Sequence, residues 1–192
     1  MSVHDADSRS QPLRGENLPK KQASPISKLA GIINAAAAAK GNGRRLDMGG
    51  HTALARLDPD AEFRPHQLAA LCRALIDAGL NPDETWLLET WRRWALIAHG
   101  MALAGHDHSQ PLGQQLSAAG VSEARVTRLL TARDDAFRQL VPRLLRLLAS
   151  KRQAPNWFDL GDLIRSEGRD EKTAERIRLK IAAGFFSAEA KK

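Results

Sequence analysis

Hydrophobic residues recur every three or four positions along most of this sequence, which is the period of an amphipathic α-helix. The pattern is clear before Gly79, where one helical face carries Leu68, Leu71, Cys72, Leu75 and Ile76. No segment alternates strictly between apolar and polar residues as a half-buried strand does, and no repeat of solenoid length is present. The sequence therefore predicts an all-α fold, a bundle of about eight helices arranged as one body or as two lobes.

Capping residues and prolines predict where several helices begin and end. We expect the first helix to run from residue 24 to Lys40, another over 85–104, and the last to end near Phe186. The expected N-terminal caps are Ser24, Asn81, Ser122, Asn156 and either Asp170 or Thr173. Pro142 interrupts an otherwise helical pattern, so a kink or a helix boundary is expected near Val141.

A helical wheel of residues 121–150 separates apolar from basic side chains. The side chains expected to face the core are Val126, Leu129, Leu130, Phe137, Leu140, Val141, Leu144, Leu147 and Leu148. The opposite side carries two pairs of arginines spaced three residues apart, one pair in each of two successive helices. The four tryptophans stand among apolar residues, and we expect them in the core rather than as platforms for bases.

Charge is distributed unevenly along the chain. The sequence has 29 basic and 22 acidic residues, a formal charge of +7, and 20 of the bases are arginines. We divide it into a basic arm expected to be disordered over 1–23, an N-terminal helical part over 24–120 and a basic C-terminal helical part over 121–192. The planar guanidinium group binds phosphate oxygens in pairs and stacks on bases. A polyanionic partner is therefore favoured, and nucleic acid is the leading candidate.

Other chemistry has little support in the sequence. Cys72 is the only cysteine, which excludes an internal disulfide and any zinc site that needs two thiolates. His99, His106, Asp107 and His108 are metal-ligand types, but adjacent loop residues converge poorly on one ion, and we expect no metal and no cofactor. We find no phosphate-binding glycine loop and no catalytic triad, so no enzyme activity is expected. Without a signal segment or a membrane span, the expected location is the cytoplasm.

One stretch, LSAAGVSEARVTRLL, also fits a helix-turn-helix, with a short helix, a glycine turn and a capped second helix. A protein of that class would place Ser122, Glu123, Arg125 and Thr127 on base edges of a specific duplex. A DNA-binding protein of this type is one alternative function. A structural adaptor whose basic face meets an acidic protein is another.

The order of several short segments resembles the small subunit of the type I-E CRISPR Cascade complex, the CasB family. The resemblance covers residues 49–186 and rests on GGHTALARLDP, PLGQQL, SEARVTRLLTA, VPRLLRLL and NWFDLGDLI. The sequence departs from the family pattern in its first helix, which is alanine-rich and follows a basic arm, and at Pro142, where the family has a second arginine.

The resemblance implies a non-catalytic, all-helical protein that is present as a pair along the belly of the complex. It implies contacts with the backbone and large subunits around the crRNA, and a basic surface that helps to hold the displaced strand of the target DNA. Pairing with the guide reads the sequence, so such a protein needs only a basic track for phosphates. The expected nucleic-acid-binding residues are Arg56, Arg125 and Arg143 from the resemblance, and Arg128, Arg133, Arg146, Lys151 and Arg152 from the helical pattern.

Overall fold

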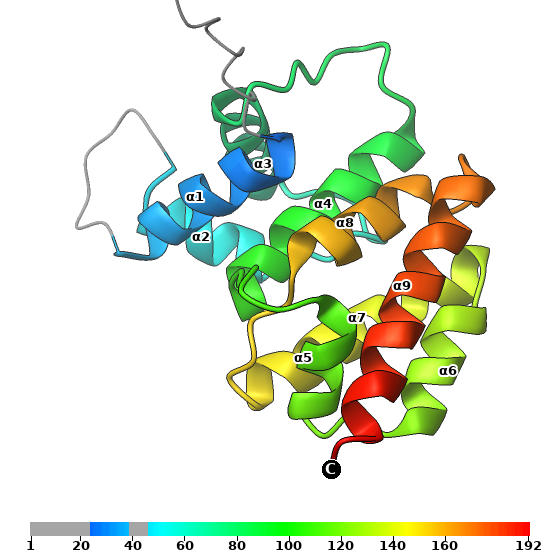
Figure 1. The fold of residues 1–192 in the computed structure, drawn as a ribbon. Helices are drawn as coiled ribbons and strands as arrows, with labels where there is room; N and C mark the ends of the chain where they lie inside the picture. The colour runs from blue at the N-terminus through cyan, green and yellow to red at the C-terminus, as the bar shows by residue number, and fades with distance from the viewer. Residues whose placement is uncertain (1–23, 39–45) are drawn as a thin grey trace, which may run out of the picture.

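The computed structural model describes residues 24–38 and 46–192, and the regular structure in these ranges is entirely helical. The helices, shown in Figure 1, are α1 (Pro25–Ala38), α2 (Met48–Ala55), α3 (Pro65–Asp77), α4 (Leu88–Ala104), α5 (Leu112–Ala118), α6 (Glu123–Thr131), α7 (Asp134–Ser150), α8 (Trp157–Ser166) and α9 (Glu171–Glu189). The predicted all-α class is confirmed for the described residues. The basic arm over 1–23 and the expected end of the first helix at Lys40 lie outside them.

Helices α4 and α8 pack against each other between two groups of helices (Figure 1). On one side, α1, α2 and α3 pack together and against α4. On the other side, α9 packs against α5, α6 and α8, while α7 packs against α4. Buried side chains from both groups belong to one hydrophobic cluster, so a single core joins them. The division of the sequence at residue 120 stays a prediction.

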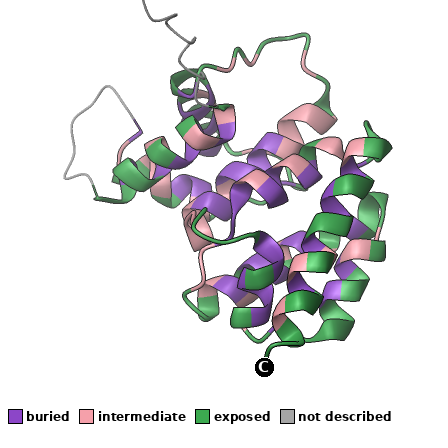
Figure 2. Cartoon of the chain, in the orientation of Figure 1, coloured by how far each residue is buried: buried purple, intermediate pink, exposed green. Residues whose placement is uncertain are grey.

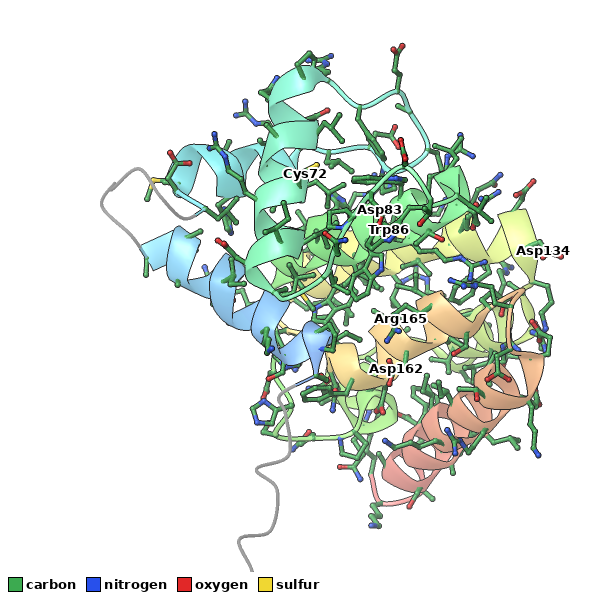
Figure 3. The ribbon with its side chains drawn as sticks, turned by 90° about the horizontal axis from the view of Figure 1, so that it is seen from above. Cys72, Asp83, Trp86, Asp134, Asp162 and Arg165 are labelled. Carbon is green, nitrogen blue, oxygen red and sulfur yellow. The ribbon has the colours of Figure 1, made fainter. Side chains whose placement is uncertain are left out.

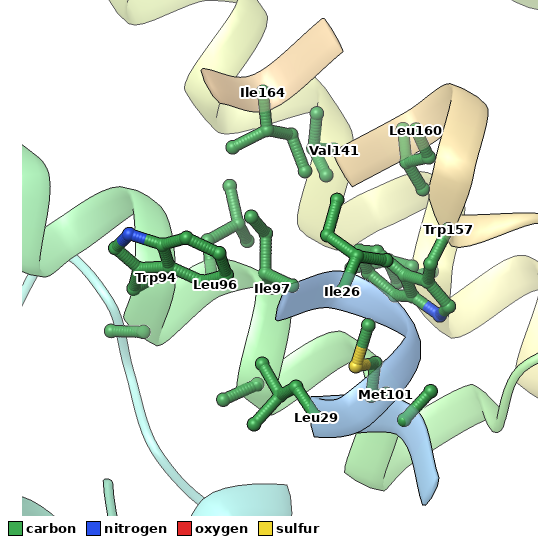
Figure 4. Close-up of a cluster of buried hydrophobic side chains, with 14 of the residues drawn as sticks. Ile26, Leu29, Trp94, Leu96, Ile97, Met101, Val141, Trp157, Leu160 and Ile164 are labelled. Carbon is green, nitrogen blue, oxygen red and sulfur yellow. The ribbon is translucent and has the colours of Figure 1, made fainter. Parts of the chain in front are cut away.

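The centre of this core lies where α1, α4, α7 and α8 meet. Figure 4 shows Ile26, Ile97, Val141, Trp157 and Leu160 gathered there, and each is at most 2% exposed. Burying an aliphatic side chain of this size contributes about 1.5–3 kcal/mol. The helices turn their buried residues inward and their exposed residues outward, as Figure 2 shows, which is the pattern that the amphipathic sequence predicts.

The tryptophans contribute to this core to different degrees. Trp94 and Trp157 are buried, as predicted, and the Trp157 indole N–H donates a 2.7 Å hydrogen bond to the Gly105 carbonyl. Trp86 and Trp91 are only half-buried, and their ring centroids lie 5.4 Å apart. The expectation of core tryptophans is therefore confirmed for two of the four.

The predicted start of α4 is wrong. The helix begins at Leu88, and its N-cap is Leu87 instead of Asn81. The reason lies in a local turn, because the Asp83 carboxylate accepts hydrogen bonds of 2.9 Å from the Thr85 N–H and 2.6 Å from the Thr85 hydroxyl. Short polar side chains of this kind offer the backbone an alternative to the helix.

Of the two outcomes expected near Val141, the helix boundary is wrong, because α7 continues through Pro142 to Ser150, and the kink stays a prediction. Val141 and Leu145, on either side of the proline, are both fully buried and hold the two halves of the helix against the core. This packing outweighs the hydrogen bond that a proline removes from a helix interior.

The remaining predicted caps differ in how they act. Ser122 occupies the N-cap of α6, but its side chain makes no capping hydrogen bond. The Asn156 side chain accepts from the Phe158 N–H at the start of α8, and Asp170 accepts from the Thr173 N–H at the start of α9, each at 3.0 Å. Asn156 and Asp170 are therefore confirmed as caps. Within residues 24–38 and 46–192, none of the helices combines the length and the hydropathy of a membrane-spanning segment.

Candidate nucleic-acid interface

Three arginines from two helices line a single groove between α6 and α7. Arg125 and Arg128 belong to α6 and Arg143 belongs to α7, and the groove encloses about 310 Å³. We call this site the arginine groove; its other lining residues are Leu129, Leu140, Leu144 and Leu147. All three arginines are exposed, and none of them forms an ion pair with another described residue.

The groove follows from the amphipathic pattern of the α6–α7 hairpin. Val126 of α6 and Phe137 of α7 are each 1% exposed and anchor the two helices in the core. Because residues three or four apart share a helix face, the arginines then lie along the outer side. A hollow next to the hairpin turn is again lined by Arg128 and Arg143, so the basic surface extends from the arginine groove toward the turn.

Arg133, at the turn of the hairpin, is engaged within the protein. Its guanidinium nitrogens lie 3.4 Å from a Glu175 carboxylate oxygen and 4.0 Å from one of Glu171. Its Nη1 also donates to the carbonyls of Leu130 and Ala132, each at 3.0 Å. Of the eight predicted residues, Arg133 is the one that has carboxylate partners within 24–38 and 46–192.

Arg56 and Arg146 belong to segments that meet at a half-buried histidine, His99. His99 Nδ1 lies 3.1 Å from the carbonyl oxygen of Leu54, two residues before Arg56. Burial lowers the pKa of His99 below its usual value; the hydrogen bond to Leu54 opposes this effect, and the positive charge of Arg146 adds to it. Both arginines are exposed; Arg146 lies on α7, three residues after Arg143, and Arg56 is the C-cap of α2.

Lys151 and Arg152 form the last group of predicted residues. They follow the end of α7 and are exposed. Arg152 has φ 55°, in the left-handed region that non-glycine residues rarely adopt. The predicted residues thus lie in the arginine groove, at the His99 junction, at the hairpin turn and at the end of α7.

The chain was compared with protein families, with curated proteins and with solved structures. The family model described as CRISPR-associated protein Cse2 matches residues 51–186. The chain belongs to the Cse2 family. This is the CasB family of small subunits of the type I-E Cascade complex, as the order of the sequence segments indicated. No curated protein and no solved structure matched the chain.

Two of the sequence segments that resemble the Cse2 family have internal packing roles. The buried Asp159 carboxylate accepts a 3.0 Å hydrogen bond from the Leu112 N–H and pairs with Lys180 at 2.6 Å, which joins α8 to α5 and α9. The Gln115 side-chain oxygen accepts a 2.6 Å bond from the Asn156 N–H. The segments PLGQQL and NWFDLGDLI therefore hold three helices together, a role that the sequence alone did not reveal.

Several arginines elsewhere on this Cse2 family protein are engaged with internal partners. Arg165 pairs with Asp162 at 3.3 Å on α8, where Figure 3 labels both residues. Its guanidinium carbon also lies 5.2 Å from the centroid of the Trp94 ring, an arrangement typical of a cation–π contact. Burial raises the pKa of the Asp162 carboxyl. The arginine groove differs from this site because its three guanidinium groups have no such partners among the described residues and line one groove together.

The histidine loop considered as a metal site is a packing element. The rings of His106 and His108 stack at a centroid distance of 5.5 Å, and both meet Phe158 edge-on. Burial lowers the pKa of His106, and the nearby charge of His108 acts in the same direction. Within the described ranges, no three His, Cys, Asp or Glu side chains are placed to hold a metal ion.

Proposed function

We propose that this Cascade subunit binds the phosphate backbone of nucleic acid through the arginine groove, and so stabilises the displaced strand of the R-loop. The observation that carries the proposal is the convergence of Arg125, Arg128 and Arg143 on one groove without carboxylate partners among the described residues. A guanidinium without an acidic partner is available for bidentate phosphate binding. The role is non-catalytic, since positive charge alone lowers the free energy of a separated strand.

The remaining predicted residues extend the same contact. Arg56 and Arg146 continue the basic surface past His99, and Lys151 and Arg152 continue it beyond the end of α7. Arg133 binds phosphate only if the phosphate displaces the Glu171 and Glu175 carboxylates from its guanidinium group. Pairing with the crRNA reads the target sequence, so contacts of this kind need no base recognition.

The protein also bridges other Cascade subunits in this proposal. Exposed apolar side chains are the residues that a protein interface would cover, and large ones stand at the start of α4 and on α9. These are Leu87, Leu88, Leu179 and Phe186. The backbone and large subunits, and a second copy of this chain, are the partners that we propose.

The helix-turn-helix alternative is less well supported. In that motif the two helices pack on each other and the second enters the major groove, whereas α5 packs mainly on α9. Ser122, Glu123, Arg125 and Thr127 are exposed, but among these four only Arg125 lines the arginine groove. The basic surface is thus centred between α6 and α7 and not on the start of α6.

The proposal is tested with Cascade assembled around the groove variant, R125Q/R128Q/R143Q, on a duplex that matches the guide. We expect the displaced strand to become accessible to a single-strand nuclease and the affinity for the duplex to fall at least tenfold. Exposed glutamine preserves the helix at little cost, so assembly is expected to continue.

A control variant, R73Q/R169Q/R176Q, removes the same charge from exposed arginines on α3, in the α8–α9 turn and on α9. We expect it to protect the displaced strand as wild type does. Equal protection by the groove variant and the control variant would overturn the proposal. Equal loss would make net charge responsible, and equal retention would show that the groove arginines are not needed.

A further inference from the structure

The arginine groove has an apolar floor that phosphate binding does not require. Leu129 and Leu144 are buried beneath it, while Leu140 and Leu147 are half-buried and line its sides. The helical pattern placed Leu140 and Leu147 in the core, yet they border the arginines. A phosphate anion gains nothing from such a surface, since a charge is stabilised by polar donors or water.

We propose that the arginine groove takes in a nucleobase of an unpaired strand, while the arginines on its rim bind the flanking phosphates. The inference rests on the proposed function and specifies its ligand. A base has two apolar faces, and small-ligand sites are typically cavities of about 300–1,000 Å³ with mostly apolar walls and few polar groups. The arginine groove, at about 310 Å³, meets this description.

The arrangement of the arginines fits a nucleotide chain. Arg125 and Arg128 stand on one wall and Arg143 on the other. In a strand, each base has a phosphate on either side, so a base between the walls places its phosphates near both groups. A guanidinium also stacks on the face of a base. A partner peptide would need carboxylates on both sides of an apolar segment to match the same rim.

The geometry favours an unpaired strand over a duplex. In a duplex both faces of a base are covered by its neighbours, and extruding a base costs a few kcal/mol. In a displaced strand this cost is smallest. Each base presents a similar face to leucine, so the contact tolerates any sequence, as base stacking on protein surfaces does.

The test measures the affinity of the full-length chain for two single strands of equal length. One strand consists of thymidines and the other of abasic residues with the same number of phosphates. We expect the thymidine strand to bind about tenfold more tightly, which equals about 1.4 kcal/mol and lies within the range for one stacked base. The salt dependence of binding should be the same for both strands, because their phosphates are equal in number.

A variant with a truncated floor, L140A/L147A, should bind the thymidine strand about as weakly as the abasic one, with no change on the abasic strand. The matched control, L87A/L88A, truncates exposed leucines at the start of α4 and should retain the tenfold preference. The affinities of wild-type protein for the thymidine strand and the abasic strand can be compared without any substitution. This comparison tests base insertion even if the floor variant folds poorly.

Equal affinity of wild type for the two strands would overturn base insertion and leave phosphate binding intact. Failure of the proposed function looks different, because the groove variant would then bind both strands as wild type does. If L140A/L147A bound strands normally but no longer joined the other Cascade subunits, the arginine groove would be a docking site for protein, and the inference would be wrong.

Discussion

At the scale of single residues, Arg146 affects His99 through its charge. Removing that charge in R146Q should raise the pKa of His99, while burial continues to hold the pKa below its usual value. An NMR titration of the imidazole signals measures the shift. The control R128Q, on the far side of the arginine groove, should leave the pKa unchanged. An identical pKa in wild type and R146Q would mean that Arg146 does not face this junction.

Arg178 is a buried arginine that the sequence pattern did not single out. It pairs with Glu167, and the two side chains are 3% and 6% exposed. Glu167 also accepts a 3.2 Å hydrogen bond from the Asp134 N–H, so the pair fixes the start of α7. R178M should reduce the free energy of unfolding by about 3–5 kcal/mol, because it leaves a buried carboxylate without its partner. Urea denaturation measures the loss.

Two further variants sharpen this test of the ion pair. R178M/E167Q removes both charges and should recover much of the lost stability. R176M, at an exposed position two residues earlier, should stay within about 0.5 kcal/mol of wild type. If R178M lowered the free energy of unfolding by less than about 1 kcal/mol, the Arg178–Glu167 pair would not be stabilising the start of α7.

The sequence predicted which side chains are exposed better than it predicted what they contact. All eight predicted phosphate-binding residues are exposed, because helical periodicity determines the side of a helix on which a residue lies. Periodicity does not reveal that Glu175, more than forty residues away along the chain, reaches Arg133. Contacts of this kind depend on how helices pack, which is why Arg178 was also missed.

At the scale of elements, the crossing of α5 and α9 depends on glycine. A Cβ atom at Gly113 would lie 2.2 Å from the Ile181 carbonyl oxygen and 2.6 Å from the Phe185 nitrogen. Backbone atoms cannot move aside as a flexible side chain can, so G113A should destabilise the protein by about 1–3 kcal/mol. Thermal unfolding measures the change.

The matched control for this crossing is G31A on α1, where no atom lies within 4 Å of the added Cβ. Alanine is favoured over glycine inside a helix by about 0.5–1 kcal/mol, so G31A should stabilise the protein. We therefore expect the melting temperature to fall in G113A and to rise in G31A. A stabilising G113A would show that α5 and α9 are further apart than the structure places them.

The helices themselves were largely predictable, whereas the arginine groove was not. The helix expected over 85–104 begins at Leu88, where the Asp83 turn delays it, and ends at Ala104, and the last helix ends at Glu189, close to the predicted Phe186. The groove exists because Leu140 and Leu147 border a gap between α6 and α7. Both leucines pack partly buried against the core, as predicted, but a helical wheel contains no information on the separation of two helices and could not show that they also line a groove.

At the scale of the whole molecule, α9 presents apolar surface in addition to charge. Leu179 and Phe186 are 62% and 42% exposed and lie seven residues apart, on the same face of the helix. L179D/F186D should greatly reduce co-purification with the other Cascade subunits while leaving strand binding by the isolated chain unchanged. K172D/R176D, on the same helix, changes more charge without removing apolar surface and should co-purify normally. Normal assembly of L179D/F186D would exclude this face as an interface.

The central claim is that the arginine groove binds phosphates, and the salt dependence of strand binding tests it most directly. For a single strand, the slope of log K against log salt is about 0.7 per phosphate neutralised. The groove variant should therefore have a slope smaller than wild type by about 2, while the control variant keeps the wild-type slope. Equal slopes for wild type and the groove variant would contradict the account.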